Sequence, residues 1–366
     1  MTVPRRRRTR RGPKQAVIID EIRGWIIGGA LRAGDRLPPY VDLQDRFGVT
    51  PVTMKRAIAR LKEDGYVVTR GARGSFVADH PPHLCTIGLV FVARPGEAGW
   101  STAYEALTLA AREAEDVPAL RFVVYHDAAP DDTTGDYRRL EADVEAHRVG
   151  GLVFAENPFM FQSSPVLHEP GTPRVGIMSQ PRPELPAVYY DQNDFWDHAI
   201  GALAAEGRKR LAALVLPMVS HEWTDKLCAK ARAAGMEADP RWVQSVAPTH
   251  PDWAANAVRM LFHEGQDSRP DALVIGDDHL VTAATNALAA MGLNAPDQVG
   301  VAAHFNLGCK PATPFPVRFF AFDVRALLQA CLARMEEQRR GQPSPPITHV
   351  AVREAQALEG SAATAP

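Results

Sequence analysis

Residues 50–77 read TPVTMKRAIARLKEDGYVVTRGARGSFV, and they decide the fold of the first part of the chain. Thr50 is a residue type that caps helices, and Pro51 suits the first helical position because no hydrogen bond is lost there. Gly65 is expected to end this helix. The apolar side chains between these two ends recur at helical spacing on one face: Met54, Ala57, Ile58 and Leu61.

A hairpin is expected directly behind this helix. Residues 66–69 and 75–78 have the composition of strands, and the glycine-containing loop 70–74 joins them. Upstream, residues 40–47 predict a second short helix, which a turn at Gly48 and Val49 separates from the first. Two helices joined by a short turn, with a hairpin behind them, are the plan of a winged helix-turn-helix domain.

This plan predicts binding to a double-stranded DNA operator, because an α-helix fits the major groove and the face opposite the apolar stripe is basic. A lone helix of this kind is more often an ordinary helix with a solvated face. The helix, the turn and the basic hairpin together favour DNA. The candidate DNA-contacting residues are Thr50, Thr53, Lys55, Arg56, Arg60, Arg70, Arg73 and Gly74.

Residues 34–78, GDRLPPYVDLQDRFGVTPVTMKRAIARLKEDGYVVTRGARGSFVA, resemble the winged-helix domain of GntR-type transcription regulators. The resemblance extends over about residues 14–78. Val41 and Pro51 stand where that family often has arginines that contact DNA. The resemblance therefore implies the fold and the DNA-binding role, but not the family's usual pattern of base contacts.

The charge distribution agrees with a single nucleic-acid-binding region. Residues 1–80 carry 17 Lys and Arg against 8 Asp and Glu, whereas the rest of the chain carries 24 against 35. Phosphate attraction supplies most non-specific affinity for DNA, so the basic first part is the expected DNA-binding part. The first residues add an arginine-rich arm, which is either a solvated tail or a segment that follows phosphates: Arg5, Arg6, Arg7, Arg8, Arg10 and Arg11.

Cysteine spacing and hydropathy exclude several other classes of protein. The four cysteines have no CxxC spacing, so neither a zinc site nor a disulfide framework is expected. No apolar run is long enough to cross a membrane, and the basic N-terminus lacks the apolar core of a signal peptide. We therefore expect a cytoplasmic protein that does not associate with membranes.

From residue 86 onward, short apolar runs alternate with helical patterns. Strands are expected at 86–92, 120–125, 151–155, 174–178, 211–216, 272–275, 299–303, 317–322 and 348–352, with helices between most of them. This alternation predicts an α/β fold of doubly wound parallel sheets. The expected domains are a disordered basic arm at 1–13, a winged-helix domain at 14–78, an extended linker at 79–85, a two-lobed effector-binding domain at 86–355 and a disordered tail at 356–366.

Several stretches of this body resemble the LacI-type, periplasmic-binding-protein-like effector domain over about residues 86–355. They are TIGLVF from residue 86, YYDQNDFWDHAIGALAAEGRKRLAALV from 189, RPDALVIGDDHLVTAATNALAAMGLNAPDQVGVAAHFN from 269 and ITHVAVREA from 347. The resemblance implies two α/β lobes with an effector cleft between them. A GntR-type head on a LacI-type body is a domain combination known among carbohydrate-responsive repressors.

The resemblance places an effector-binding aspartate at Asp278, where a helix N-cap is the alternative role. Asp191 matches an aspartate at the lobe crossover, where a structural hydrogen-bonding role and a ligand contact are equal alternatives. Trp223 stands where the family often has an arginine that grips the ligand. Trp100 and Tyr104 follow the first strand, where ligand-facing aromatics are expected. Two further candidates replace the usual residues at the end of a later strand: His304 and Asn306.

No metal, cofactor or catalytic site is expected. Asp277, Asp278 and His279 are adjacent, and adjacent side chains on a helix point in different directions. The sequence has no phosphate-binding loop and no nucleophile elbow. The sequence therefore predicts a dimeric transcription repressor, not an enzyme, that is controlled by a small effector such as a sugar. The alternatives are a solute-binding or sensor protein and a regulator fused to an aminotransferase-like enzyme.

Overall fold

The computed structural model describes residues 14–97, 99–114, 120–130, 135–183, 185–217, 220–266, 268–343 and 345–355. The arginine-rich arm and the tail at 356–366, for which disorder was predicted, lie outside these residues. The chain divides into two compact units. Unit 1 contains residues 1–90, 115–153 and 159–174, and unit 2 contains residues 91–114, 154–158 and 175–366. This division is not the predicted one, because part of the predicted effector domain groups with the winged helix.

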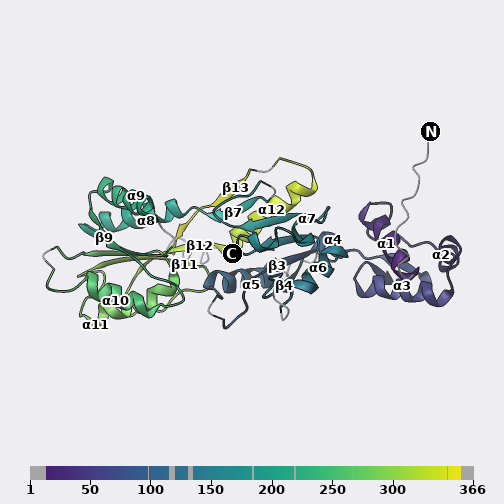
Figure 1. Ribbon diagram of the computed structural model, residues 1–366, viewed down its shortest axis with the longest axis horizontal. Helices are drawn as coiled ribbons and strands as arrows, with labels where there is room; N and C mark the ends of the chain where they lie inside the picture. Colours follow the sequence, from purple (N-terminus) through teal and green to yellow (C-terminus); the bar gives the residue numbers. More distant parts are fainter. Residues whose placement is uncertain are drawn as a thin grey trace, which may run out of the picture. The chain divides into compact units, whose positions relative to one another are not determined.

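Unit 1 begins with a winged helix, as predicted (Figure 1). Its elements are α1 (Lys14–Ile27), α2 (Tyr40–Phe47), α3 (Pro51–Glu63), β1 (Val67–Thr69), η1 (Gly71–Arg73) and β2 (Ser75–Val77). The predicted cap is confirmed, since the Thr50 side chain accepts a hydrogen bond from the backbone N–H of Thr53. The predicted apolar stripe of α3 is fully buried against α1, which fixes the opposite face toward solvent.

The rest of unit 1 starts with α4 (Pro82–Cys85), so the expected extended linker is wrong for its second half. Pro82 stands in the first turn of α4, where a proline is tolerated because its N–H is not needed. The elements that follow are β3 (Thr86–Val90), β4 (Arg121–Tyr125), α6 (Tyr137–Glu145), β5 (Gly151–Phe154), η2 (Phe159–Phe161) and α7 (Pro165–His168). β3 and β4 pair in parallel.

Unit 2 contains the remaining helices and strands. The helices are α5 (Thr102–Ala114), α8 (Gln192–Ala205), α9 (His221–Ala233), α10 (Asp252–Leu261), η3 (Asp278–Leu280), α11 (Val281–Ala290) and α12 (Val324–Arg339). The strands are β6 (Arg174–Ile177), β7 (Ala187–Tyr190), β8 (Arg210–Val215), β9 (Glu237–Ser245), β10 (Ala272–Ile275), β11 (Gly300–Asn306), β12 (Arg318–Phe322), β13 (Ile347–Val350) and β14 (Arg353–Glu354). β6 begins one residue before the unit does.

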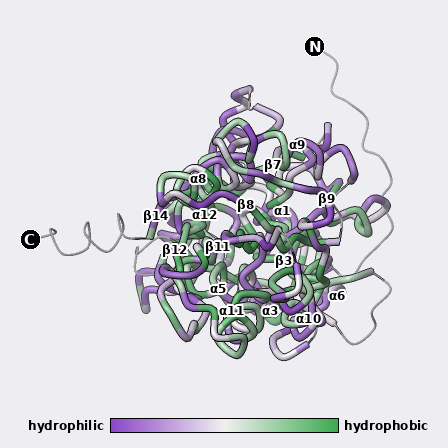
Figure 2. The backbone as a smooth tube through the Cα atoms, turned by 90° about the vertical axis from the view of Figure 1, so that its left-hand side faces the viewer, coloured by the Kyte–Doolittle hydropathy of each residue, from purple (hydrophilic) through white to green (hydrophobic). Residues whose placement is uncertain are grey.

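The strands form two six-stranded sheets, of order β14-β12-β11-β10-β8-β9 and β13-β7-β6-β5-β3-β4. The recorded pairings are parallel except for the antiparallel pair of β12 and β14. This confirms the predicted α/β class with parallel sheets. In Figure 2 much of β9 is hydrophilic, in keeping with its place at a sheet edge, whereas every residue of β10 is buried. None of the described helices is both long and apolar enough to cross a membrane.

Candidate functional site

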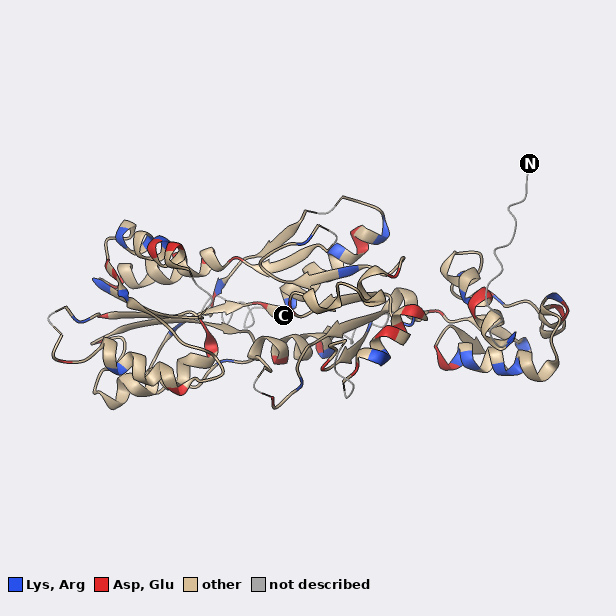
Figure 3. Ribbon diagram, viewed as in Figure 1, with Lys and Arg blue, Asp and Glu red and all other residues tan. Residues whose placement is uncertain are grey.

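The exposed face of α3 is the candidate DNA-contacting surface. Lys55 and Arg56 are exposed, and within the described part of the chain neither forms an ion pair. Figure 3 shows Lys and Arg along this helix. Thr50 and Thr53 stand at its start, with their hydroxyl oxygens 3.0 Å apart. Free cations near a helix N-terminus are what phosphate and base contacts require.

Other predicted DNA-contacting residues differ in their availability. The Arg60 guanidinium lies 3.1 Å from the Asp64 carboxylate, and that of Arg70 lies 3.1 Å from the carboxylate of Asp79. Arg73 is exposed at the end of η1, and Gly74 follows it with a φ of 104°, in the region that favours glycine. Lys55, Arg56 and Arg73 are therefore the cations on this surface best placed to meet DNA.

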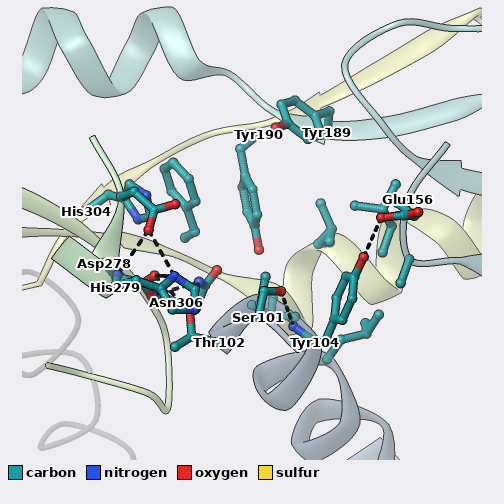
Figure 4. A pocket seen from close by; sticks show the side chains of 18 of the residues that line it. Ser101, Thr102, Tyr104, Glu156, Tyr189, Tyr190, Asp278, His279, His304 and Asn306 are labelled. Carbon is teal, nitrogen blue, oxygen red and sulfur yellow. Dashed lines mark hydrogen bonds and ion pairs between the residues drawn. The ribbon is translucent and has the colours of Figure 1, made fainter. Parts of the chain in front are cut away.

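The candidate effector site is a cavity of about 290 Å³, all of whose lining residues belong to unit 2. It lies at the carboxyl ends of parallel strands, where α/β sheets bind ligands, and the first turns of α5 complete its wall (Figure 4). The polar lining residues are Ser101, Thr102, Tyr104, Glu156, Tyr189, Tyr190, Gln192, Asp277, Asp278, His279, His304 and Asn306. The cavity thus combines an apolar wall with several convergent polar groups, as ligand sites usually do.

Asp278 is the centre of a hydrogen-bond network in this cavity. Its side chain is almost completely buried, and its two oxygens lie 2.8 and 2.7 Å from the Thr102 hydroxyl, which donates to the carboxylate. The Asn306 amide nitrogen donates to Asp278 Oδ2 over 3.0 Å. The alternative role as a helix cap belongs to the preceding residue, because the Asp277 side chain accepts the backbone N–H at the start of η3.

His279 is bound by both neighbouring carboxylates. Its Nδ1 lies 2.9 Å from Asp277 Oδ1 and 3.3 Å from Asp278 Oδ1. The expectation that these adjacent side chains diverge is wrong, because they belong to a tight 3-10 turn and not to an α-helix. Their potential ligand atoms lie within 4.8 Å of one another, so these three residues can be brought to a common metal ion.

The same contacts set the charges of the network. Hydrogen bonds to Asp277 and Asp278 raise the pKa of His279 to about 10, so the imidazole is cationic at neutral pH. Burial would raise the pKa of Asp278, but the hydrogen bond from His279, the nearby His304 ring and the Thr102 hydroxyl outweigh it and lower this pKa to about 2. An imidazolium thus lies between two carboxylates at one end of the cavity.

A pH dependence of stability follows from the raised pKa of His279. The stabilisation is complete below the ordinary histidine pKa of 6.5 and is lost as the pH rises toward the folded-state value of about 10. We therefore expect the free energy of unfolding to fall between these two pH values. Denaturant titrations across this range should show the decline in the wild type and a smaller decline in His279→Gln. Equal declines would contradict the assignment of the proton to His279.

Three stacked rings form one wall of the cavity. Phe322 lies between Tyr190 and His304, with ring centroids 4.3 and 4.5 Å away, respectively. Tyr190 and His304 are each 7% exposed, and among the described residues the Tyr190 hydroxyl and His304 Nδ1 have no hydrogen-bond partner. Buried polar atoms of this kind normally have partners, so these two atoms are exceptions within the residues that line the cavity.

The opposite end of the cavity contains a carboxylate without a cation. The Tyr104 hydroxyl donates to Glu156 Oε2 over 2.7 Å, and Figure 4 shows this pair apart from the Asp278 network. Burial and then Glu156 raise the pKa of Tyr104, so its hydroxyl remains a donor at neutral pH. Glu156 forms no ion pair with any described residue, which leaves its charge facing the cavity.

The other predicted effector residues lie outside this cavity. Trp100 packs against Phe91 and Tyr104, and its indole N–H donates to Glu105 over 3.1 Å. Trp223 lines a smaller neighbouring cavity and packs edge-on against Trp196. Asp191 caps α8 by accepting the backbone N–H groups of its first turn, so its contacts are structural.

Several lining residues were not among the sequence candidates. Glu156 follows β5 at a strand's carboxyl end, which is a signal that could have identified it. Tyr190 and Tyr189 lie in a short strand that the hydrophobic pattern does not distinguish from the helix behind it. The further residues of this group are Ser101, Thr102, Gln192 and Phe322.

A second charge cluster lies in unit 1, at the end of α3. The Asp64 side chain is 3% exposed and lies 3.6 Å from Arg23, 3.1 Å from Arg60 and 3.5 Å from Arg148. Next to it, the Tyr66 hydroxyl donates to the backbone carbonyl of His147 over 2.5 Å. These contacts fix the C-terminal end of the candidate recognition helix to the segment that follows α6.

Comparison with known proteins assigns the two parts of the chain separately. Residues 14–77 match the family described as bacterial regulatory proteins, gntR family, and residues 200–357 match a periplasmic binding protein-like domain. Over 66 residues the chain is 41% identical to RmpR of Mycobacterium gastri, which is assigned by name to the HTH-type transcriptional regulators. That match covers 18% of this chain and spans about a quarter (24%) of the relative.

Solved structures show the same fold over most of the chain. The complex of the transcriptional regulator CelR with cellobiose has a TM-score of 0.57 and 20% identity, over 84% of this chain and 90% of the other. A regulatory protein of the LacI family from Chloroflexus aggregans has a TM-score of 0.57 and 18% identity, over 74% and 96%. The chain therefore carries a GntR-type helix-turn-helix domain at residues 14–77 and a periplasmic-binding-protein-like domain at residues 200–357, in a fold similar to that of LacI-family regulators.

Proposed function

We propose that the protein is a transcription repressor that binds operator DNA through its winged helix and is controlled by a small effector bound in the unit 2 cavity. Its role is to bind DNA and effector, and it catalyses no reaction. We place it in the cytoplasm, because a repressor must reach the chromosome. The observation that carries this proposal is a cavity with many polar lining side chains at the carboxyl ends of parallel strands, on a chain whose recognition helix exposes free cations.

The cavity supports an effector about the size of one sugar ring. Its volume of about 290 Å³ is near the lower end of ligand sites, which span roughly 300–1,000 Å³. Its stacked rings offer flat faces, and its carboxylates, hydroxyls and imidazoles offer hydrogen bonds to hydroxyl groups. The likeness to a regulator solved with cellobiose supports a carbohydrate-like ligand.

The control of DNA binding rests on a shift between conformations. An effector that binds one conformation more tightly shifts the population toward that conformation. The largest change it can cause in DNA affinity is set by the ratio of its own affinities for the two conformations. We propose that the protein works as a homodimer on an inverted repeat whose half-sites lie about one helical turn, or a simple multiple, apart.

The proposal is tested by in vitro selection of duplex DNA, followed by a thermal-shift screen against sugars and related metabolites. A ligand that binds only the folded state raises its apparent stability, so binding is visible before the ligand is known. We expect an inverted repeat from the selection and a stabilising compound that alters operator affinity. A protein that selects no sequence would contradict the proposed function.

The recognition helix gives a more specific prediction. Replacing Arg56 with Ala should weaken operator binding, because an exposed cation is removed from the face of α3 opposite its buried stripe. If Arg56 contacts a phosphate, the plot of log affinity against log salt concentration should become shallower by about one unit of slope. Electrophoretic mobility shifts at several salt concentrations measure both.

Arg259→Ala is the matched control, since Arg259 is exposed on α10 of unit 2. It should leave both the affinity and the slope unchanged. An Arg56→Ala protein that binds the operator with wild-type affinity would place the recognition surface elsewhere.

A further inference from the structure

The charges that line the cavity limit which effector it accepts. Three carboxylates line it, those of Glu156, Asp277 and Asp278, and no lining side chain among the described residues is Lys or Arg. The guanidinium of Arg325, which follows a lining residue, lies 2.5 Å from the carboxylate of Glu113 and is used there. A phosphate or carboxylate on a ligand would meet like charges in this cavity, because the His279 ring already contacts the carboxylates of Asp277 and Asp278.

The three carboxylates are not equivalent. The His279 ring contacts both Asp277 and Asp278, and Asp278 also accepts from Thr102 and Asn306. Among the described residues, the hydrogen-bond partner of Glu156 is the Tyr104 hydroxyl on Oε2, and no described residue donates to its Oε1. Glu156 is therefore the carboxylate with capacity to bind a further donor.

The rings around the cavity suit a cation as well. Tyr104, Tyr189, Tyr190 and Phe322 line it together, and the faces of such rings attract ammonium groups. Tyr190 and His304 line the cavity too, so a hydroxyl and an imidazole are available to polar groups of the ligand away from Glu156. In Figure 4, Tyr190, Glu156 and Asp278 all appear among the residues that line this one cavity.

We propose that the effector is a polyhydroxylated amine, such as an amino sugar, whose ammonium group binds Glu156 while its hydroxyl groups bind Tyr190 and His304. This inference rests on the proposed function, because it concerns the ligand of the same cavity. Charge-assisted hydrogen bonds from an ammonium to a carboxylate are roughly twice as strong as neutral ones. The site consequently discriminates in favour of an amine over its neutral and acidic counterparts.

The test uses three amino sugars, glucosamine, galactosamine and mannosamine, each beside its N-acetyl derivative and the uronic acid of the same ring. Calorimetric titration of the full chain at mildly acidic pH, where the amine is protonated, should give at least one amine that binds about tenfold tighter than its N-acetyl form. The uronic acids should not bind. Glu156→Gln should lose about tenfold in affinity for the amine and leave the N-acetyl form unchanged.

Glu237→Gln is the matched control, because Glu237 is an exposed carboxylate outside the cavity lining, and it should change neither affinity. The inference is overturned if no amine binds, if a neutral or acidic form binds more tightly, or if Glu156→Gln keeps the wild-type preference for the amine. A neutral sugar that releases the operator would overturn this inference and leave the proposed function standing. An amine that binds at Glu156 without altering operator affinity would support this inference and contradict the proposed function.

Discussion

Replacing Asp278 with Ala is expected to reduce the affinity for the effector by at least about tenfold. The substitution removes a buried carboxylate that holds Thr102, Asn306 and His279 in place around the cavity. Hydrogen bonds to charged groups contribute roughly 1.5–3 kcal/mol each, and 1.4 kcal/mol corresponds to a factor of ten in affinity. The measurement is a calorimetric titration of the full chain with a compound that stabilises the wild type.

Operator binding without effector should survive this substitution, because the winged helix has a buried core of its own. Asp297→Asn is the control, since Asp297 is an exposed carboxylate of unit 2 that does not line the cavity. Asp278→Asn separates charge from shape, because the amide keeps the size of the side chain. An Asp278→Ala protein that binds effector with wild-type affinity would remove Asp278 from the site.

Asp64→Asn is expected to destabilise the winged helix by about 3–5 kcal/mol, because breaking a buried ion pair leaves uncompensated charges. The side chain of Arg23 is 10% exposed and would keep only a 3.5 Å contact with the exposed Asp20. Native-state hydrogen exchange measures the local stability of the winged helix. In Asp64→Asn the amide protons of α1 and α3 should exchange faster than in the wild type, because this domain opens more often.

Glu63→Gln is the matched control for this substitution. Glu63 contacts the same Arg60 guanidinium over 3.4 Å, but its side chain is 66% exposed, so its loss should cost little. Equal protection in Asp64→Asn and Glu63→Gln would mean that the buried position of Asp64 has no energetic consequence.

The winged helix could be predicted almost completely from the sequence, because its signals are local. A capping threonine, a first-turn proline and a four-residue apolar stripe fix α3, and glycines fix its turns. The buried strands β8 and β10 were likewise predicted within a residue, since continuous apolar runs between helical patterns indicate parallel strands.

The edge strands β4 and β13 were predicted at 120–125 and 348–352, but the edge strands β9 and β14 were not, because their sequences lack such runs. β9 contains Asp239, Pro240 and Arg241 and pairs only with β8, so its polar composition hides a strand of nine residues. The two-residue strand β14 pairs with β12 at the outer position of its sheet, where pairing is decided by tertiary contacts and not by local pattern.

The candidate site was predicted in part. Asp278, Tyr104, His304 and Asn306 line the cavity, and each stands at a strand end or a helix start that the sequence marks. The position of Glu156 after β5 could have marked it as a candidate, but its contact with Tyr104, 52 residues away, could not be predicted from local pattern. Trp100 and Trp223 fall outside the cavity because each packs against other aromatic rings. The convergence of Asp277, Asp278 and His279 could not be predicted either. A 3-10 turn and an α-helix start with similar sequences, so the local pattern does not tell them apart.

The most direct test of the account is the coupling between the two ligands of the full chain. Operator affinity is measured by fluorescence anisotropy with and without a saturating effector, and effector affinity is measured with and without saturating operator. The account predicts that the two affinities change by the same factor, because coupling between binding sites is reciprocal. An operator affinity that stays constant while the cavity is filled would contradict the claim that this cavity controls DNA binding.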